Sequence, residues 1–235
     1  MNTPRFDLAI SQTLRSGTRS FQLELKLQSP CQQLVVYGPS GAGKSMLLKT
    51  IAGLNRPDAG HIRLDGRCLF DSAQGICLSP QQRQLGYLFQ DYALFPHLTV
   101  RQNIGFGLQR GWRNPARQRH DAAVDYWLEA FGLTAQAGQL PATLSGGQRQ
   151  RTALARALVT EPRALLLDEP FSALDPSLRQ QLRAELAELL QRLRIPLLLI
   201  THDADDVRCF GEQTLYLQDG RLVEPPASQT ETSHG

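Results

Sequence analysis

The sequence predicts an α/β fold with a mostly parallel core sheet and an antiparallel β layer near the N-terminus. Short apolar runs at 34–37 and 164–167 are typical of strands buried in a parallel sheet. Helical patterns follow both runs, and strands that alternate with helices are typical of parallel sheets. Before them, apolar and polar residues alternate over 6–10 and 21–27, which indicates a half-buried antiparallel hairpin.

The composition is typical of a globular cytosolic protein. Its 235 residues are enough for a large domain, and the formal net charge of +3 gives no reason to expect a nucleic-acid partner. The four cysteines show neither C-x-x-C spacing nor a histidine cluster, so we expect reduced thiols. The start of the chain lacks the apolar core of a signal peptide, and the longest apolar runs are too short to span a bilayer.

The first third of the chain predicts strands and one helix. The hairpin is expected to turn at 15–18, and a glycine-rich loop leads into a helix at 46–52. A strand around 62–64 meets Asp65-Gly66, which predicts a tight turn into a return strand at 67–70.

The rest of the chain predicts helices with capping signals, alternating with short apolar strands. The helices are expected at 100–108, 115–131, 147–159, 176–193 and 203–210, and the strands at 84–89, 164–167 and 196–200. The expected helix starts are Thr99, Asn114-Pro115, Ser145 and Asp175. Asp219-Gly220 predicts a last hairpin. We expect one domain over 1–225, with a helical insertion at about 91–150 and a disordered tail at 226–235.

The loop after the strand at 34–37 has the pattern G-x-x-x-x-G-K-[ST] between a strand and a helix. Its residues are Gly38, Pro39, Ser40, Gly41, Ala42, Gly43, Lys44 and Ser45. Glycines let backbone N–H groups turn toward an oxyanion, and the following helix directs its positive end there. In such a P-loop the lysine reaches the β- and γ-phosphates, and the serine hydroxyl is a ligand of Mg²⁺. The sequence therefore predicts a nucleoside triphosphate site of the P-loop NTPase kind.

Two carboxylates follow the apolar strand at 164–167. Asp168 is suited to hold Mg²⁺ through water, in a Walker-B arrangement. Glu169 could accept a proton from the attacking water. Because open α/β sheets place their ligands at the carboxyl ends of strands, we expect both residues to belong to the triphosphate site.

Further motifs resemble those of the ATP-binding cassette (ABC) ATPases. Leu144-Ser145-Gly146-Gly147-Gln148 is similar to the signature motif of this family and lies just before the Walker-B strand. Gln90 matches its Q-loop, Asp175 its D-loop and His202 its switch histidine. These motifs occur in the family's order and cover about 34–223, nearly the whole chain.

The resemblance implies ATP and Mg²⁺ as ligands and a homodimer of cassettes paired head to tail. The signature residues Ser145, Gly146, Gly147 and Gln148 of one chain would contact the ATP held by the other. The implied catalytic residues are Glu169, His202 and Gln90. The implied metal ligands are Ser45, Gln90 and, through water, Asp168.

One position departs from the family pattern. The family usually carries an aromatic residue before the P-loop that stacks on adenine, but Arg15 stands near the expected spacing. Either an arginine plane or a leucine covers the base, or the base is loosely held. Adenine is therefore expected from the resemblance alone.

Two classes of function fit these motifs: the energy-coupling subunit of a membrane transporter, and a soluble ABC ATPase not coupled to transport. The segment 91–100 resembles the part of importer cassettes that receives a coupling helix from the permease, which favours the transporter. The segment 75–97 looks most like molybdate importer ATPases, although sulfate, thiosulfate, ferric-iron and polyamine importers share much of it. Such relatives often carry a C-terminal β-domain, which we expect this chain to lack.

The importer interpretation implies partners in and beyond a membrane. We expect two integral-membrane permease subunits and, indirectly, a periplasmic or extracellular substrate-binding protein. The chain would then be a peripheral protein at the cytoplasmic face of the inner membrane.

Overall fold

The computed structural model describes residues 4–16, 19–108, 115 and 121–224. It divides into two compact units, one formed by 1–83 with 198–235 and the other by 84–197. Each unit is described by itself below. The predicted tail at 226–235 and the predicted helix start at Asn114 lie outside the described residues.

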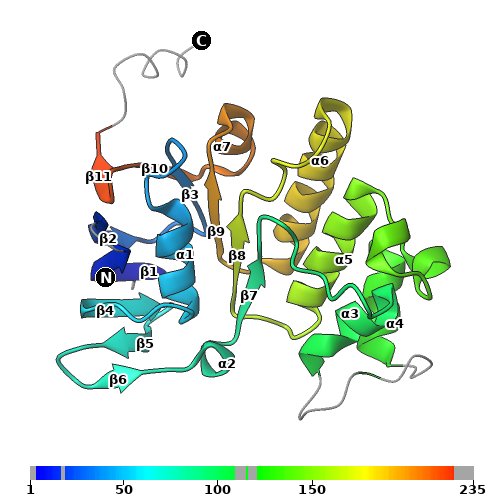
Figure 1. The fold of residues 1–235 in the computed structure, drawn as a ribbon, viewed down its shortest axis with the longest axis horizontal. Helices are drawn as coiled ribbons and strands as arrows, with labels where there is room; N and C mark the ends of the chain where they lie inside the picture. Colours follow the sequence, from blue (N-terminus) through cyan, green and yellow to red (C-terminus); the bar gives the residue numbers. More distant parts are fainter. Residues whose placement is uncertain (1–3, 17–18, 109–114, 116–120, 225–235) are drawn as a thin grey trace. The chain divides into compact units, whose positions relative to one another are not determined.

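The first unit contains the antiparallel layer that the sequence predicts (Figure 1). Its strands are β1 (Phe6–Ser16), β2 (Arg19–Ser29), β3 (Gln33–Tyr37), β4 (Ala59–Leu64), β5 (Arg67–Asp71), β6 (Ile76–Cys77), β9 (Leu197–Thr201), β10 (Gln213–Gln218) and β11 (Arg221–Val223). They are ordered β6-β5-β4-β1-β2-β11-β10-β3-β9. β1 is antiparallel to β2 and β4, whereas β3 is parallel to β10.

Alternation of side chains explains the register of the first hairpin. Leu8 pairs with Leu27 and Ile10 pairs with Leu25, and all four side chains are buried. A shift by one residue would turn this apolar set to the opposite face. The hairpin predicted over 6–27 is thus confirmed.

Two short turns also form as predicted. At Asp65-Gly66 the backbone φ angles are 45° and 75°, and at Asp219-Gly220 they are 47° and 78°. Two consecutive positive φ angles characterise the type I′ turn, which matches the twist of a two-residue hairpin. The flanking strands β4 with β5 and β10 with β11 are antiparallel pairs.

The helices of the first unit are α1 (Lys44–Ala52), α2 (Pro80–Arg83) and α7 (Ala204–Phe210). Neither α2 nor β6 was expected from the sequence. Arg83 explains why this segment is ordered, because its buried guanidinium donates to the carbonyl oxygens of Thr50 (2.9 Å) and Ile51 (2.6 Å) at the end of α1. Gly53 leaves room for it, since a Cβ at that position would lie 2.6 Å from Arg83 Nε.

The second unit joins a parallel strand pair to a group of helices (Figure 1). Its elements are β7 (Leu85–Leu88), β8 (Ala164–Asp168), α3 (Val100–Gly105), α4 (Ala122–Ala130), α5 (Gly146–Leu158) and α6 (Pro176–Leu193), with 3₁₀ turns at Phe106–Leu108, Thr134–Gln136 and Pro141–Thr143. β7 and β8 are parallel. Most of the helices lie between these strands in the chain, as the predicted insertion requires. The limits of a single domain over 1–225 stay a prediction.

Capping chemistry sets the helix starts of this unit. Thr99 and Ser145 are helix starts, as predicted, and both form complete capping boxes, of which only the one at Thr99 was expected. The start predicted for the next helix is wrong, because α4 begins after Asp121, whose side chain accepts from the backbone N–H of Ala123 at 3.0 Å. Asp121 has an extended backbone, so no helix can run through it from Pro115. The expected helix at 100–108 is α-helical only to Gly105 and ends in a 3₁₀ turn.

Within the described residues, no helix combines the length and the apolar character needed to cross a membrane.

Candidate functional site

The predicted phosphate loop connects β3 to α1 in the first unit. Gly41 and Gly43 have φ angles of 84° and 98°, which residues with a Cβ rarely adopt. At Gly38 the reason for glycine is different, because a Cβ there would lie 2.2 Å from the carbonyl oxygen of Leu217. The loop can therefore take this path only with glycine at these positions.

Lys44 lies across the loop that it ends. Its side chain is buried, and Nζ donates to the carbonyl oxygens of Gly38 (2.7 Å) and Pro39 (3.0 Å). The first turn of α1 contains no acidic residue, so the positive end of the helix dipole is not offset by its own side chains. Ser45 is half-buried in the same turn. A helix start combines backbone N–H groups with the positive end of the helix dipole, and together with a lysine it is suited to bind an anion.

The strand β9 brings His202 to the phosphate loop within the first unit. The backbone N–H of Gly38 donates to the carbonyl oxygen of Thr201 at 3.3 Å, one residue before His202. The Thr201 hydroxyl donates to Asp206 Oδ2 at 2.6 Å and accepts from the N–H of Asp203 at 3.0 Å. The turn that presents His202 is thus fixed, and the His202 side chain is exposed.

The second unit holds the two predicted carboxylates at the end of β8. Asp168 is 3% exposed, and its Oδ2 accepts from the Tyr87 hydroxyl at 3.2 Å. Burial, then the charge of Asp168 and this hydrogen bond, raise the pKa of Tyr87 far above its ordinary value, so Tyr87 stays a neutral donor. The sequence analysis missed Tyr87, although its place on β7 beside β8 follows from the parallel pairing.

Glu169 is held in a strained backbone conformation. Its φ is 46°, in the left-handed region that favours glycine. Ser172 holds this turn, since its N–H (3.2 Å) and its hydroxyl (2.9 Å) both donate to the carbonyl oxygen of Glu169. Gln90 Nε2 lies 3.4 Å from Glu169 Oε2, which is a long hydrogen bond. The structure thus brings the predicted Q-loop residue to the predicted catalytic base.

The predicted signature residues form the start of α5. Ser145 Oγ accepts from the N–H of Gln148 at 3.2 Å, and Gln148 Oε1 accepts from the N–H of Ser145 at 2.9 Å. Gln148 therefore caps its own helix in this structure. Gly146 lets Leu174 approach, since a Cβ there would lie 3.2 Å from a Leu174 methyl group. Asp175, the next residue, is the N-cap of α6 and accepts from the N–H of Leu178 at 3.1 Å.

The predicted site residues fall into two groups. The P-loop and His202 belong to the first unit, and Gln90, Ser145, Asp168, Glu169 and Asp175 belong to the second. The proposed metal ligands are a hydroxyl, a carboxamide and a carboxylate, and oxygen atoms of these kinds suit Mg²⁺. With Gln90 Nε2 directed at Glu169, the oxygen of that carboxamide is the atom suited to a cation. The donor set therefore fits the metal chemically.

The position expected to cover a nucleotide base is occupied by Arg15, which is exposed on β1. An aromatic ring nevertheless lies against the phosphate loop. A Cβ at Gly43 would meet Phe21 Cζ at 2.8 Å. In the sequence Phe21 only continues the alternating pattern of β2, so nothing there distinguished it from a core residue.

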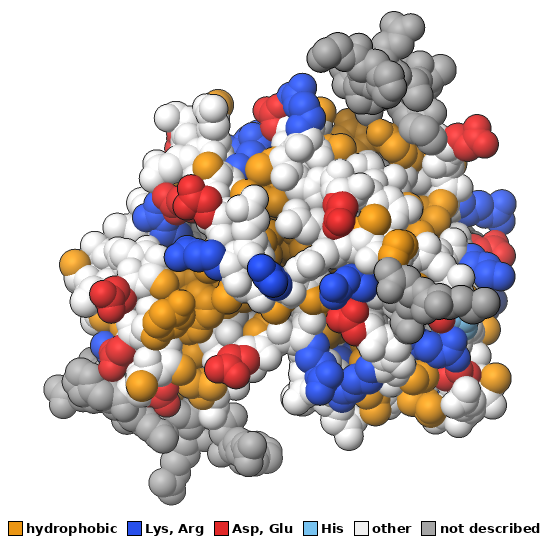
Figure 2. Space-filling model, turned by 180° about the vertical axis from the view of Figure 1, so that it is seen from behind, with side chains coloured by type: hydrophobic (Ala, Val, Ile, Leu, Met, Phe, Trp, Pro, Cys, Tyr) orange, Lys and Arg blue, Asp and Glu red, His pale blue; other side chains and the backbone are white. Residues whose placement is uncertain are grey.

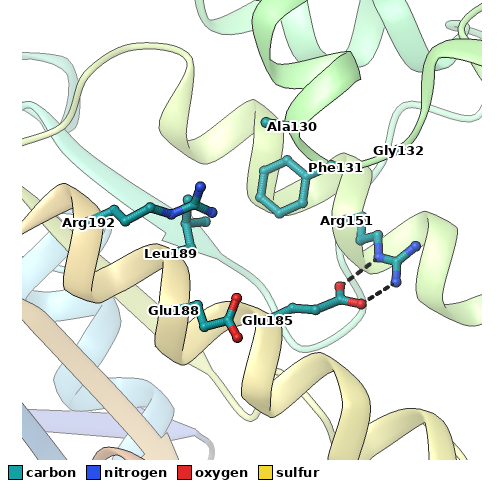
Figure 3. A pocket seen from close by; sticks show the side chains of 8 residues that line it. All are labelled: Ala130, Phe131, Gly132, Arg151, Glu185, Glu188, Leu189 and Arg192. Atoms are coloured by element: carbon teal, nitrogen blue, oxygen red, sulfur yellow. Dashed lines mark hydrogen bonds and ion pairs between the residues drawn. The ribbon is translucent and has the colours of Figure 1, made fainter.

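A separate hollow of ≈320 Å³ opens on the second unit between α4, α5 and α6. Figure 3 shows the ring of Phe131 facing Glu188 and Arg192 across it. Arg151 and Glu185 close one side through two hydrogen bonds of 3.1 and 2.8 Å. None of the predicted site residues lines this hollow.

The charges visible on one face of the molecule are mixed. Figure 2 shows acidic and basic side chains interspersed, without one large area of a single sign. This agrees with the small formal net charge of +3.

Known proteins resemble this chain over most of its length. The molybdenum import ATP-binding protein ModC of Paramagnetospirillum magneticum is 42% identical over 210 residues, or 89% of this chain and 56% of that protein. The sulfate/thiosulfate import ATP-binding protein CysA of Thermosynechococcus vestitus is 42% identical over 92% of this chain and 61% of its own length. The spermidine/putrescine import ATP-binding protein PotA of Nitratidesulfovibrio vulgaris is 41% identical over 90% and 57%. The chain thus spans between 56% and 61% of the length of these curated relatives.

Solved structures support the fold. The ATP-binding cassette MJ0796, in a dimeric post-hydrolysis state bound to ADP and Pi, matches with a TM-score of 0.76 at 29% identity over 93% of this chain and 97% of that one. The sequence model of the family described as ABC transporter matches residues 22–172, more than half of the chain. The fold is that of a P-loop ABC ATPase, as expected, and the phosphate loop and the start of α5 both lie within the matched residues 22–172: the chain belongs to the ABC transporter family.

Proposed function

We propose that this chain is the ATP-hydrolysing, energy-coupling subunit of an importer, and that the imported substrate is molybdate. The observation that carries the ATPase part is the phosphate loop, where Lys44 lies over a turn that only glycines can form. The names of several similar proteins, which are molybdenum import ATP-binding proteins, support the substrate. We propose 1–225 as one cassette.

The residues divide the work of hydrolysis between them. Backbone N–H groups of the loop, the start of α1 and Lys44 would hold the phosphates of ATP. Glu169, oriented by Gln90 and Ser172, would accept the proton of the attacking water. Mg²⁺ would be held by Ser45, by Gln90 and, through water, by Asp168, and when bound it supplies positive charge to the phosphate oxygens. His202 would contact the γ-phosphate.

A homodimer would complete each site. Ser145 and the N–H groups of Gly146 and Gly147 begin a helix of 13 residues, which makes a second anion-binding helix start in the same chain. A single nucleotide at the P-loop can use both starts when two chains pair head to tail, with Ser145, Gly146, Gly147 and Gln148 reaching the partner's ATP and Asp175 near the contact. The dimeric MJ0796 cassette is in keeping with this arrangement.

Coupling to transport would run through the segment after Gln90. Phe95 and Phe106 form an aromatic pair there with ring centroids 4.3 Å apart, and Phe106 is 37% exposed. A half-exposed aromatic pair suits a protein contact. We propose that it receives one of two integral-membrane permease subunits at the cytoplasmic face of the inner membrane, with a substrate-binding protein on the far side.

Uptake of labelled molybdate and labelled sulfate, measured in cells with the gene deleted and restored, tests this proposal. Loss of molybdate uptake alone is the expected result. Loss of sulfate or of spermidine uptake instead would keep the importer and change the substrate, as the CysA and PotA relatives allow. If no uptake changes while the chain still hydrolyses ATP, the soluble ATPase class is favoured.

A further inference from the structure

The segment that follows Gln90 contains a strained turn. Tyr92 and Ala93 have φ angles of 63° and 42°, so two consecutive residues with side chains occupy the left-handed region. The Tyr92 side chain is 5% exposed, and its hydroxyl is buried without a hydrogen-bond partner among the described residues. Such a conformation persists only where the surrounding structure fixes it.

Arg156 on α5 provides the contacts that fix the turn. Its Nη1 donates to the carbonyl oxygen of Ala93 and its Nη2 to that of Tyr92, both at 2.7 Å. The planar guanidinium thus donates from two separate nitrogens to two successive carbonyl groups, in a geometry that a lysine ammonium, with its single nitrogen, does not reproduce. The same guanidinium lies 5.6 Å from the ring centre of Phe95.

Asn103 on α3 holds the other end of the segment. Its side chain is fully buried and donates to the carbonyl oxygens of Phe95 (3.2 Å), Leu98 (2.9 Å) and Thr99 (3.1 Å). Its Oδ1 accepts from the N–H of Phe95 at 2.9 Å. The segment 92–99 is therefore tied to α5 at one end and to α3 at the other, and these two helices are in contact.

The helix α5 carries the predicted signature residues as well as Arg156. It begins after Ser145 and continues without a break through Arg156 to Leu158. On the other side of the turn, Gln90 stands two residues before Tyr92 and points to Glu169. Arg156 is thus the side chain that connects the turn after Gln90 with the helix that starts at Ser145.

We propose that Arg156 is a positioning residue that makes the 92–99 segment and α5 move as one body. This proposal rests on the proposed function, in which Gln90 responds to bound nucleotide and the 92–99 segment contacts the permease. In this proposal Arg156 acts through the two carbonyl groups that it holds.

Hydrogen exchange of the full-length chain tests the contact directly. Arg156→Ala should speed exchange of the Tyr92, Phe95 and Leu98 amides about tenfold, as expected for one to two lost hydrogen bonds. Arg156→Lys should give a smaller increase. Arg151→Ala is the matched control, because Arg151 lies on the same helix and its guanidinium pairs with Glu185, away from the segment. Equal exchange in Arg156→Ala and Arg151→Ala would overturn the proposal.

A second substitution that relieves the backbone strain at Ala93 should partly restore slow amide exchange in an Arg156 variant. Glycine accepts a φ of 42° without penalty, so Ala93→Gly should reduce the effect of Arg156→Lys on the exchange of these amides. Under saturating ATP, Arg156→Ala should lower kcat about tenfold or more with KM for ATP changed less than about twofold, since the lost interaction positions and does not bind. Faster exchange with an unchanged kcat would confine Arg156 to a structural role.

Nucleotide protection separates this proposal from the proposed function. With ATP and Mg²⁺ added, the backbone amides of 38–45 should be protected from exchange in the wild type, in Arg156→Ala and in Arg151→Ala. If none is protected in the wild type, the proposed function fails. If they are protected and the amides of 92–99 exchange at the same rate in Arg156→Ala and Arg151→Ala, only the role of Arg156 fails.

Discussion

Replacing Tyr87 by phenylalanine removes one hydroxyl and tests how the carboxylate at the end of β8 is held. Tyr87 donates to Asp168 at 3.2 Å, and Asp168 is 3% exposed. A hydrogen bond to a charged group contributes about 1.5–3 kcal/mol to stability. Because Asp168 keeps its other contacts, we expect the free energy of unfolding to fall by the lower figure, about 1.5 kcal/mol, at pH 8.

Alkaline pH gives this prediction a second signature. The pKa of Tyr87 is raised in the folded chain, mainly by burial and then by Asp168, from an ordinary value of 10.0. Above that value the unfolded chain loses the proton while the folded chain keeps it, so the stability that Tyr87 contributes is lost as pH rises from about 10. The difference between wild type and Tyr87→Phe should therefore shrink by about 0.8 kcal/mol at pH 10.5.

Urea unfolding at pH 8 and at pH 10.5 measures both effects. Tyr126→Phe is the control, because Tyr126 is 58% exposed and its ring contact with Trp127 survives the change. The control should match the wild type at pH 8. Equal unfolding midpoints for Tyr87→Phe and wild type at pH 8, or a difference that does not shrink at pH 10.5, would refute the reasoning.

Four further changes test other parts of the chain. Glu169→Gln should let ATP bind and trap a dimer while turnover falls about 10²–10⁴-fold, the contribution of a general base; ATPase assays and gel filtration check this, and near-normal turnover would remove Glu169 from its role. Ser145→Arg should abolish hydrolysis but not binding of a fluorescent ATP analogue, and intact turnover would contradict the shared site. Gly38→Ala places a Cβ 2.2 Å from a carbonyl oxygen and should cost about 1–3 kcal/mol in urea unfolding; Gly138→Ala, with open space around it, is the control. Burial raises the pKa of Asp7, but hydrogen bonds from three side chains outweigh it and leave that pKa below 3.8. The free energy of unfolding of the wild type should therefore exceed that of Asp7→Asn at pH 7, and this difference should be lost as pH falls below about 4. A difference at pH 3 equal to that at pH 7 would contradict this.

Local patterns were enough to predict the elements whose causes are local. The apolar strands, the tight turns at Asp65-Gly66 and Asp219-Gly220 and the helix starts at Thr99 and Ser145 each depend on residues close in the chain, and all of them formed. The predicted start of α4 was wrong for an equally local reason: Asp121 has an extended backbone, and its carboxylate caps the helix by accepting from the N–H of Ala123.

Contacts between distant segments were beyond such patterns. Arg83 was not recognised as the cap of α1, because its partners Thr50 and Ile51 lie about thirty residues earlier. Tyr87 and Phe21 looked like ordinary strand residues, although one hydrogen-bonds Asp168 and the other contacts Gly43. Residue type and spacing indicate which interactions a side chain can make, but the topology of the fold determines which distant residues it contacts.

Some of the strained residues in the second unit lie beyond the strands that lead to the candidate catalytic residues. Glu169 comes directly after β8, the Tyr92–Ala93 turn lies beyond the end of β7, and none of these left-handed residues is a glycine. Each is held by donors to its carbonyl oxygen, from Ser172 for Glu169 and from Arg156 for the turn. Left-handed residues of this kind cost roughly 1–3 kcal/mol each and are retained where a site needs an unusual geometry. If the strain serves hydrolysis, then glycine at position 93 should stabilise the chain, whereas loss of Ser172 or Arg156 should lower turnover more than stability.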